Sequence, residues 1–123
     1  MKLAATDRPV INRQLHELAS AIEELLRAGL TAASQSTREA MDVTFREASR
    51  LKLLRLAATL RAANEELGRF VAKQPDFNAK RLTFFLNRAW MLARGLQQAL
   101  KDDDSDAWER LLWMPPSEPV ARI

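Results

Sequence analysis

The stretch 36–73 constrains the fold more than any other part of the chain, because nothing within it is expected to stop a helix. It contains no proline, and its only glycine is Gly68. Ser36 and Glu39 have the spacing of a capping box, in which each side chain accepts a hydrogen bond from the other residue's backbone amide. Pro75 ends the stretch, since proline cannot continue a helix. The sequence therefore predicts one helix over about 37–73, about 55 Å long at roughly 1.5 Å per residue.

The middle of this helix, from Leu51 to Leu60, is apolar on nearly every side, whereas its two ends are apolar on one side only. A helix that is apolar all round is expected to be surrounded by neighbours. If the preceding helix packs along the first half and the following helix along the second, the ends stay partly uncovered in a single chain. This pattern indicates a partner. The alternative is a break near residues 61–64, which would give two shorter helices folded against each other.

A second helix is predicted over about 8–28, before the central stretch. Apolar residues recur there at alternating steps of four and three, from Ile11 to Leu25. Such a stripe is typical of the core side of a bundle helix. Pro9 suits the first turn, and Gly29 suits the position just after the last turn. The short connection that follows favours an antiparallel arrangement with the central helix.

Two further helices are predicted after the central stretch, over about 79–101 and about 105–113. Asn78 is well placed to cap the first of them. Alanine, leucine, arginine and glutamate, which are good helix formers, dominate the composition, and the chain has only three glycines and no tyrosine. We predict an all-α antiparallel bundle of three main helices plus a short fourth, forming a single domain over 1–114 with an extended tail over 115–123.

The residue types that usually support catalysis or metal binding are scarce. The chain has no cysteine, and its one histidine, His16, cannot supply the three or four good ligands that a zinc site normally needs. The run of aspartates over 102–106 resembles the start of an EF-hand loop, but Ala107 occupies the glycine position and Trp113 the position of the bidentate glutamate. There is no Ser/His/acid set and no glycine-rich phosphate loop. We therefore predict a protein that is not an enzyme, with no metal, cofactor or small-molecule substrate.

The ends of the chain and its hydropathy suggest a cytoplasmic location. The first residues lack the long apolar core of a signal peptide. No stretch approaches the roughly 20 apolar residues that a membrane span requires. We expect no membrane association.

The adjacent carboxylates Glu65 and Glu66 could suggest a metal site, but neighbouring helical residues point about 100° apart and usually lie on a solvated face. Glu65 with Arg69, and Glu23 with Arg27, instead have the i,i+4 spacing of weakly stabilising ion pairs.

The function predicted from these features is a protein–protein interaction module, as a homodimer or with another protein partner. The contact would cover the apolar ends of the long central helix. The candidate interface residues are Met41, Phe45, Phe70, Val71, Phe84, Trp90 and Trp113.

The alternative, which we favour less, is a nucleic-acid-associated protein. The net charge is +3, and Lys80, Asn87, Arg94 and Lys101 recur at intervals of seven, so that they fall along one line of the predicted helix 79–101. Such a line of positive charge can contact phosphates, although it is also typical of a solvated face. The candidate anion-contacting residues are Arg46, Arg50, Arg61, Lys80, Arg88, Arg94 and Lys101.

Overall fold

The computed structural model describes residues 3–29 and 35–113, with the backbone alone described at 35–37 and Trp113. Within these ranges the chain is all-helical and contains no strand. The helices are α1 (Arg8–Ala28), α2 (Gln35–Arg50), α3 (Leu54–Val71), α4 (Ala79–Asp102) and α5 (Ser105–Trp113).

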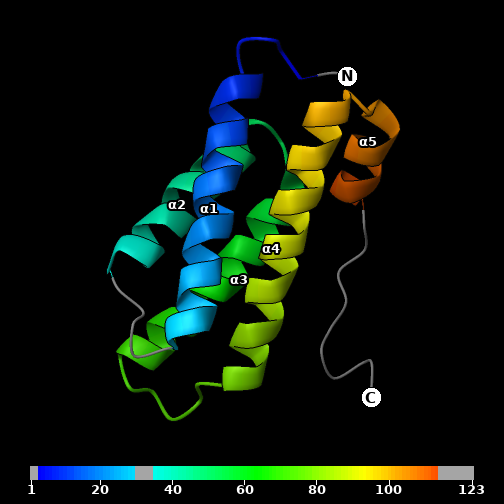
Figure 1. The fold of residues 1–123 in the computed structure, drawn as a ribbon. Coiled ribbons are helices and arrows are strands. Elements are labelled where there is room, and N and C mark those ends of the chain that lie inside the picture. The colour runs from blue at the N-terminus through cyan, green and yellow to red at the C-terminus, as the bar shows by residue number, and fades with distance from the viewer. Residues whose placement is uncertain (1–2, 30–34, 114–123) are drawn as a thin grey trace.

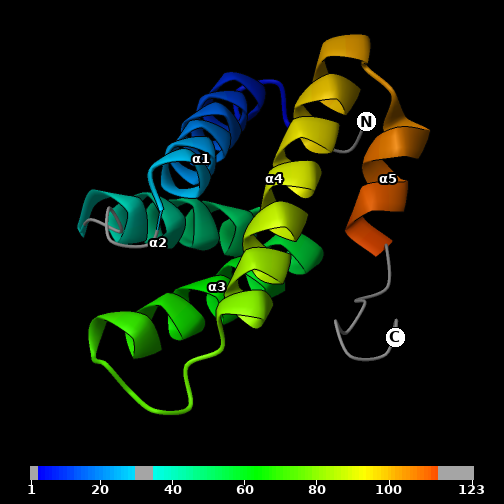
Figure 2. The ribbon, with the colours of Figure 1, turned by 60° about the horizontal axis from the view of Figure 1, so that its bottom comes forward.

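The first four helices run alternately down and up and form a closed ring (Figure 1). Each packs against its neighbour in the sequence, and α1 also packs along α4, which closes the ring. Figure 2 shows α2 between α1 and α3, and α5 on the far side of α4 from α1. α5 packs against both α4 and α3. The prediction of an antiparallel all-α bundle is confirmed in its class, but the bundle has four main helices instead of three.

The predicted continuous helix over 37–73 is wrong, because the chain turns back on itself at residues 51–53. The last turn of α2 closes with bonds from the Lys52 amide to the Ser49 carbonyl (3.2 Å) and from the Leu53 amide to the Ala48 carbonyl (2.7 Å). These are the two bonds of a Schellman motif, with Lys52 in the left-handed region at φ 62°. The alternative break near 61–64 is also misplaced, although its consequence, two shorter helices folded against each other, is what the structure shows.

The turn at 51–53 lets both halves of the central stretch face the same core. Leu53 is 1% exposed, and the buried face of α3 continues through Leu56, Leu60 and Leu67. The apolar residues that would encircle one straight helix are therefore divided between two helices that face the same core. α2 also begins earlier than predicted, at Gln35, so that Ser36 lies within the helix.

The stripes predicted for the other helices do form the core. In α1 the buried residues run from Ile11 to Leu25 with the predicted spacing, and in α4 they run from Leu82 to Ala99. The bounds of α1 and α5 match the predicted ranges, and α4 ends one residue later than predicted. Trp108 of α5 is 3% exposed and belongs to the same core, so it packs α5 against the other helices.

Helix ends follow the predicted capping only in part. The Asn78 side chain accepts a hydrogen bond from the Arg81 amide at 3.0 Å, which confirms it as the cap of α4. The Asp104 side chain accepts from the Ala107 amide at 3.0 Å and caps α5. Asp7 occupies the N-cap position of α1 but makes no side-chain capping bond.

The connection between α3 and α4 is held by a fully buried carboxylate, that of Glu66. Its Oε2 accepts from the Asn78 amide at 2.9 Å, and its Oε1 accepts from Arg69 at 3.0 Å. The Arg81 guanidinium lies 3.6 Å from the same Oε1. A buried charge is tolerated when it is paired and hydrogen-bonded in this way. The expectation that Glu65 and Glu66 share a solvated face is therefore wrong for Glu66.

Candidate functional site

A groove follows the outer side of α3, beginning where α5, the α2–α3 connection and the N-terminal segment meet. At this end lies a cavity of about 750 Å³. Two smaller hollows continue it between α2 and α3: the first shares Ala58 with the cavity, and the second shares Phe45, Arg61 and Glu65 with the first. We call this continuous surface the α3 groove. The argument below uses its residues Phe45, Leu54, Arg55, Ala58, Ala62, Glu65 and Leu112.

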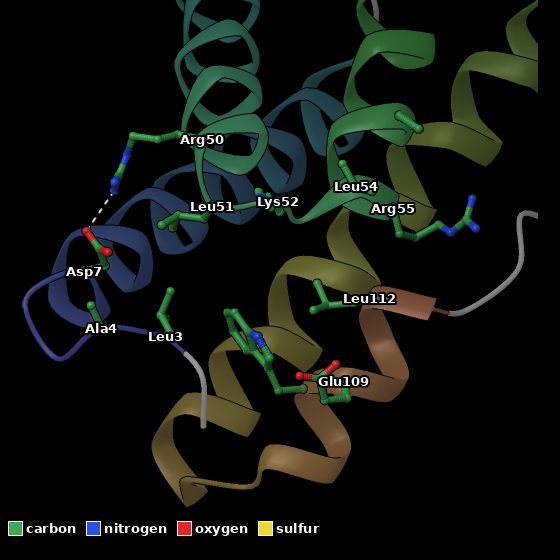
Figure 3. A pocket seen from close by; sticks show the side chains of 12 residues that line it. Leu3, Ala4, Asp7, Arg50, Leu51, Lys52, Leu54, Arg55, Glu109 and Leu112 are labelled. Atoms are coloured by element: carbon green, nitrogen blue, oxygen red, sulfur yellow. Dashed lines mark hydrogen bonds and ion pairs between the residues drawn. The ribbon is translucent and has the colours of Figure 1, made fainter.

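Leucine side chains from three segments line the cavity at the first end of the groove. Figure 3 shows Leu3 from the N-terminal segment, Leu51 from the α2–α3 connection and Leu112 from α5 around the opening. Leu54, at the start of α3, is 63% exposed, although it belongs to a stretch that is otherwise largely buried. Ala58, one turn further along α3, is also exposed. A large apolar side chain beside a small one makes an uneven apolar surface that another helix can fit.

Charged groups border the groove at both ends. At the end with the cavity, the Arg50 guanidinium donates to the Asp7 carboxylate at 2.9 Å and also pairs with Glu47. Hydrogen bonds to Glu47 and then Asp7 raise the pKa of Arg50 above its usual range. Arg55 lies at the same end, and its Nε is buried without a hydrogen-bond partner. At the other end the Glu65 carboxylate accepts from Arg61 at 3.2 Å, which corrects its predicted pairing with Arg69.

The structure scatters the seven candidate interface residues over different surfaces. Phe45 forms part of the α3 groove. Phe70 packs against Phe77, with ring centroids 5.2 Å apart, and the neighbouring Val71 is 50% exposed. Met41 lies at the floor of the second hollow of the α3 groove but is 0% exposed, so it belongs to the core of the monomer.

The remaining three candidates lie on α4 and α5. Phe84 is half-buried against Phe85, with ring centroids 5.5 Å apart. Trp90 is half-buried and bonded to α1. The side chain of Trp113 lies outside the described residues.

Four of the seven candidate anion-contacting residues are engaged with carboxylates of this chain. Arg50 and Arg61 make the pairs already described, Arg46 pairs with Asp42 at 2.8 Å, and Arg94 pairs with Glu23 at 3.1 Å. Arg88 is half-buried and engaged in an interaction, and Lys80 and Lys101 are exposed on α4. A phosphate would have to displace the carboxylate from each paired arginine, which weakens the case for a basic binding strip.

A polar network joins α1 to α4. The Trp90 indole donates to Glu23 Oε1 at 3.0 Å, and Arg94 donates to the same oxygen at 3.1 Å. Arg94 also donates to Gln97 at 2.9 Å. The predicted partner of Glu23, Arg27, instead pairs with Glu24. Because sequence spacing reveals pairs within one helix only, it could not identify these partners on another helix.

The hydrogen bond from Trp90, followed by that from Arg94, lowers the pKa of Glu23 below its ordinary value. The stabilisation is therefore present above the unfolded-state pKa and is lost as the pH falls through the lower folded-state pKa. We expect Trp90→Phe to move the pKa of Glu23 back toward its ordinary value, as measured by NMR titration of the side-chain carboxyl. Phe84→Leu, on the same helix but outside the network, should leave this pKa unchanged. An unchanged pKa in Trp90→Phe would mean that the indole does not hold the carboxylate in solution.

Two further properties concern the described part of the chain. Residues 3–29 and 35–113 contain no group of three or more histidine, aspartate or glutamate side chains that could hold a metal ion. None of the described helices is long and apolar enough to cross a membrane.

Comparison with known proteins finds no family model, no curated protein and no solved structure that matches this chain.

Proposed function

We propose that this protein is a non-enzymatic interaction module that self-associates, and that the α3 groove is its contact surface. The observation that carries the proposal is the exposure of Leu54, 63% accessible beside the exposed Ala58 at the rim of the groove. The groove takes the place of the uncovered helix ends predicted from the sequence, because the central helix is divided.

The apolar lining of the groove supports a helix as the binding element. Fully burying one leucine side chain contributes about 2 kcal/mol, and Leu54 is a large exposed apolar side chain that no other part of the described chain covers. Ala58 and Ala62 are small enough to let a second helix approach closely. Phe45 on α2 and Leu112 on α5 stand beside this face of α3 and would contact the sides of the bound helix. Recognition of an amphipathic helix in an apolar groove is a common mode of protein association.

The order of residues along α3 supports a second copy as the partner. Arg55, Ala58, Ala62 and Glu65 are three, four and three residues apart, so they lie on one face of the helix. Suppose that two copies of α3 pack antiparallel about a twofold axis that passes between Ala58 and Ala62. Ala58 of each copy then lies against the partner's Ala62. The same operation brings the Arg55 guanidinium beside the carboxylate of the partner's Glu65. Such a self-complementary contact is what a symmetric homodimer requires.

The proposal is tested by Leu54→Glu, with size-exclusion chromatography and light scattering at low and high salt. We expect the dissociation constant of the dimer to rise on the order of 100-fold or more, because the dimer loses two buried leucines and gains two buried charges. Met91→Glu is the matched control, since Met91 is also 63% exposed but lies on α4 away from the groove. The control should leave the dimer intact.

The antiparallel orientation is tested in the same assay by exchanging charges. Arg55→Glu and Glu65→Arg should each weaken the dimer, and the two together should restore it, because the double variant re-forms the pair with opposite polarity. Three results would count against the proposal: a monomer at every concentration, a dimer that tolerates Leu54→Glu, or salt-sensitive binding to DNA or RNA without self-association.

A further inference from the structure

The connection at 51–53 divides α2 from α3 without the residues that normally end one helix and begin another. The left-handed position after a helix is usually glycine, but here it is Lys52, at φ 62°. A side chain in this conformation places Cβ close to the following carbonyl, which is unfavourable. The N-cap of α3 is Leu53, whose side chain cannot accept a hydrogen bond, and no side-chain cap is present.

The local sequence therefore favours a helix at the point where the structure has a turn. Leucine and lysine are good helix formers, and no proline or glycine lies between Arg50 and Leu54. What holds the turn is tertiary packing, since Leu53 is 1% exposed and belongs to the core that α2 and α3 share. A conflict between local preference and global packing reduces the free-energy gap between the native arrangement and an alternative one.

We infer that residues 51–53 are an exchange hinge, through which two copies of this chain can swap their halves. When the hinge straightens, α2 and α3 become one helix, and α1–α2 separates from α3–α4–α5. Both halves then expose core surface, and the surface that covers each one best is the matching half of a second copy. In the exchanged dimer α1–α2 of one copy packs on α3–α4–α5 of the partner, which re-forms the α1–α4 and α2–α3 contacts of the monomer.

The physical basis of the exchange is general. Nearly every contact of the exchanged dimer already exists in the monomer, so the free-energy difference between the two depends mainly on the hinges and on protein concentration. Short connections under strain favour this outcome, because opening relieves the strain. The inference does not depend on the α3 groove, since it rests on the backbone at Lys52 and not on an exposed surface.

Lys52→Gly tests the hinge directly. Glycine removes the cost of the left-handed conformation in the closed turn and disfavours the continuous helix in the open form. Because a dimer contains two hinges, we expect its dissociation constant to rise on the order of 100-fold. The dimer would be prepared by refolding at high protein concentration and measured by light scattering after dilution.

Lys73→Gly is the matched control. Lys73 also has a left-handed backbone, at φ 54°, and follows α3 in the same type of helix end, with bonds to Phe70 and Arg69 carbonyls. Pro75 prevents a longer helix there, so no exchange can occur at this position. Lys73→Gly should leave the dissociation constant unchanged. Equal effects of the two glycine variants, or no effect of Lys52→Gly, would overturn the inference.

A chemical cross-link distinguishes an exchanged dimer from an ordinary one. The chain has no cysteine, and the side chains of Glu23 on α1 and Arg94 on α4 are in contact. In the double variant Glu23→Cys, Arg94→Cys, a short thiol-to-thiol reagent should join the two positions. In the monomer the link lies within one chain, but in the exchanged dimer it joins two chains, and a denaturing gel then shows a covalent dimer.

The possible results separate the hinge from the α3 groove. Covalent dimers from the isolated dimer fraction would support exchange. Dimers that yield only internally linked monomers would overturn exchange while leaving self-association through the groove in place. Failure to dimerise even after refolding at high concentration would overturn both proposals.

Discussion

Met41→Ala is expected to lower the free energy of unfolding by about 3 kcal/mol. The side chain is 0% exposed and belongs to the core cluster. Truncation removes its apolar contacts with the core and leaves a cavity that the surrounding helices fill only in part. Urea unfolding followed by circular dichroism, at a concentration where the protein is monomeric, measures the loss.

Met91→Ala is the control for this measurement. Met91 is 63% exposed on α4, so its truncation should change the stability by less than about 0.5 kcal/mol. If Met41→Ala weakened self-association while leaving the monomer as stable as before, Met41 would belong to the interface that the sequence predicts and not to the core.

Glu66→Ala is expected to lower the free energy of unfolding by about 2 to 3 kcal/mol. The variant leaves the Asn78 amide without its acceptor and removes the anion that Arg69 and Arg81 share. Both arginines are partly exposed and can be rehydrated, which keeps the loss below that of an isolated buried charge. The effect should appear in thermal or urea unfolding of the monomer.

Two further variants test this explanation: one removes the charge of Glu66 but keeps its shape, and the other truncates its exposed neighbour Glu65. Glu66→Gln should lose less than Glu66→Ala, because an amide oxygen can still accept from the Asn78 amide. Glu65→Ala should change the monomer stability by less than about 0.5 kcal/mol, since the Glu65 side chain is 53% exposed and pairs only with Arg61. Equal losses at 65 and 66 would show that the buried network does not hold the α3–α4 connection.

Helix periodicity predicted the elements whose ends carry recognisable residues. α1 has Pro9 in its first turn and Gly29 directly after its last residue, and α4 begins after Asn78, so both were placed nearly correctly. The division between α2 and α3 could not be predicted in this way, because Lys52 occupies the left-handed position where glycine would be expected. Packing of the core decides the turn there, and packing depends on residues far away in the sequence.

The exposure of single side chains in the candidate site could not be predicted from the sequence either. Leu53 and Leu54 are adjacent leucines, but one is 1% exposed and the other 63%. Their exposure differs because of the direction in which α3 leaves the turn, and the sequence does not indicate that direction. Phe45 was among the predicted interface residues and does lie in the groove, whereas Leu54 was missed because it was assigned to a fully surrounded segment.

The order of helices around the ring also bears on how the chain folds. Three of its four helix pairs, α1–α2, α2–α3 and α3–α4, join neighbours in the sequence, and only α1–α4 joins distant segments. Local hairpins form quickly, whereas a contact between distant segments must first overcome the entropy of a long loop. We expect the contact between α1 and α4 to form last. The hydrogen bonds that Trp90 and Arg94 donate to Glu23 then stabilise the contact that is formed in the final step of folding.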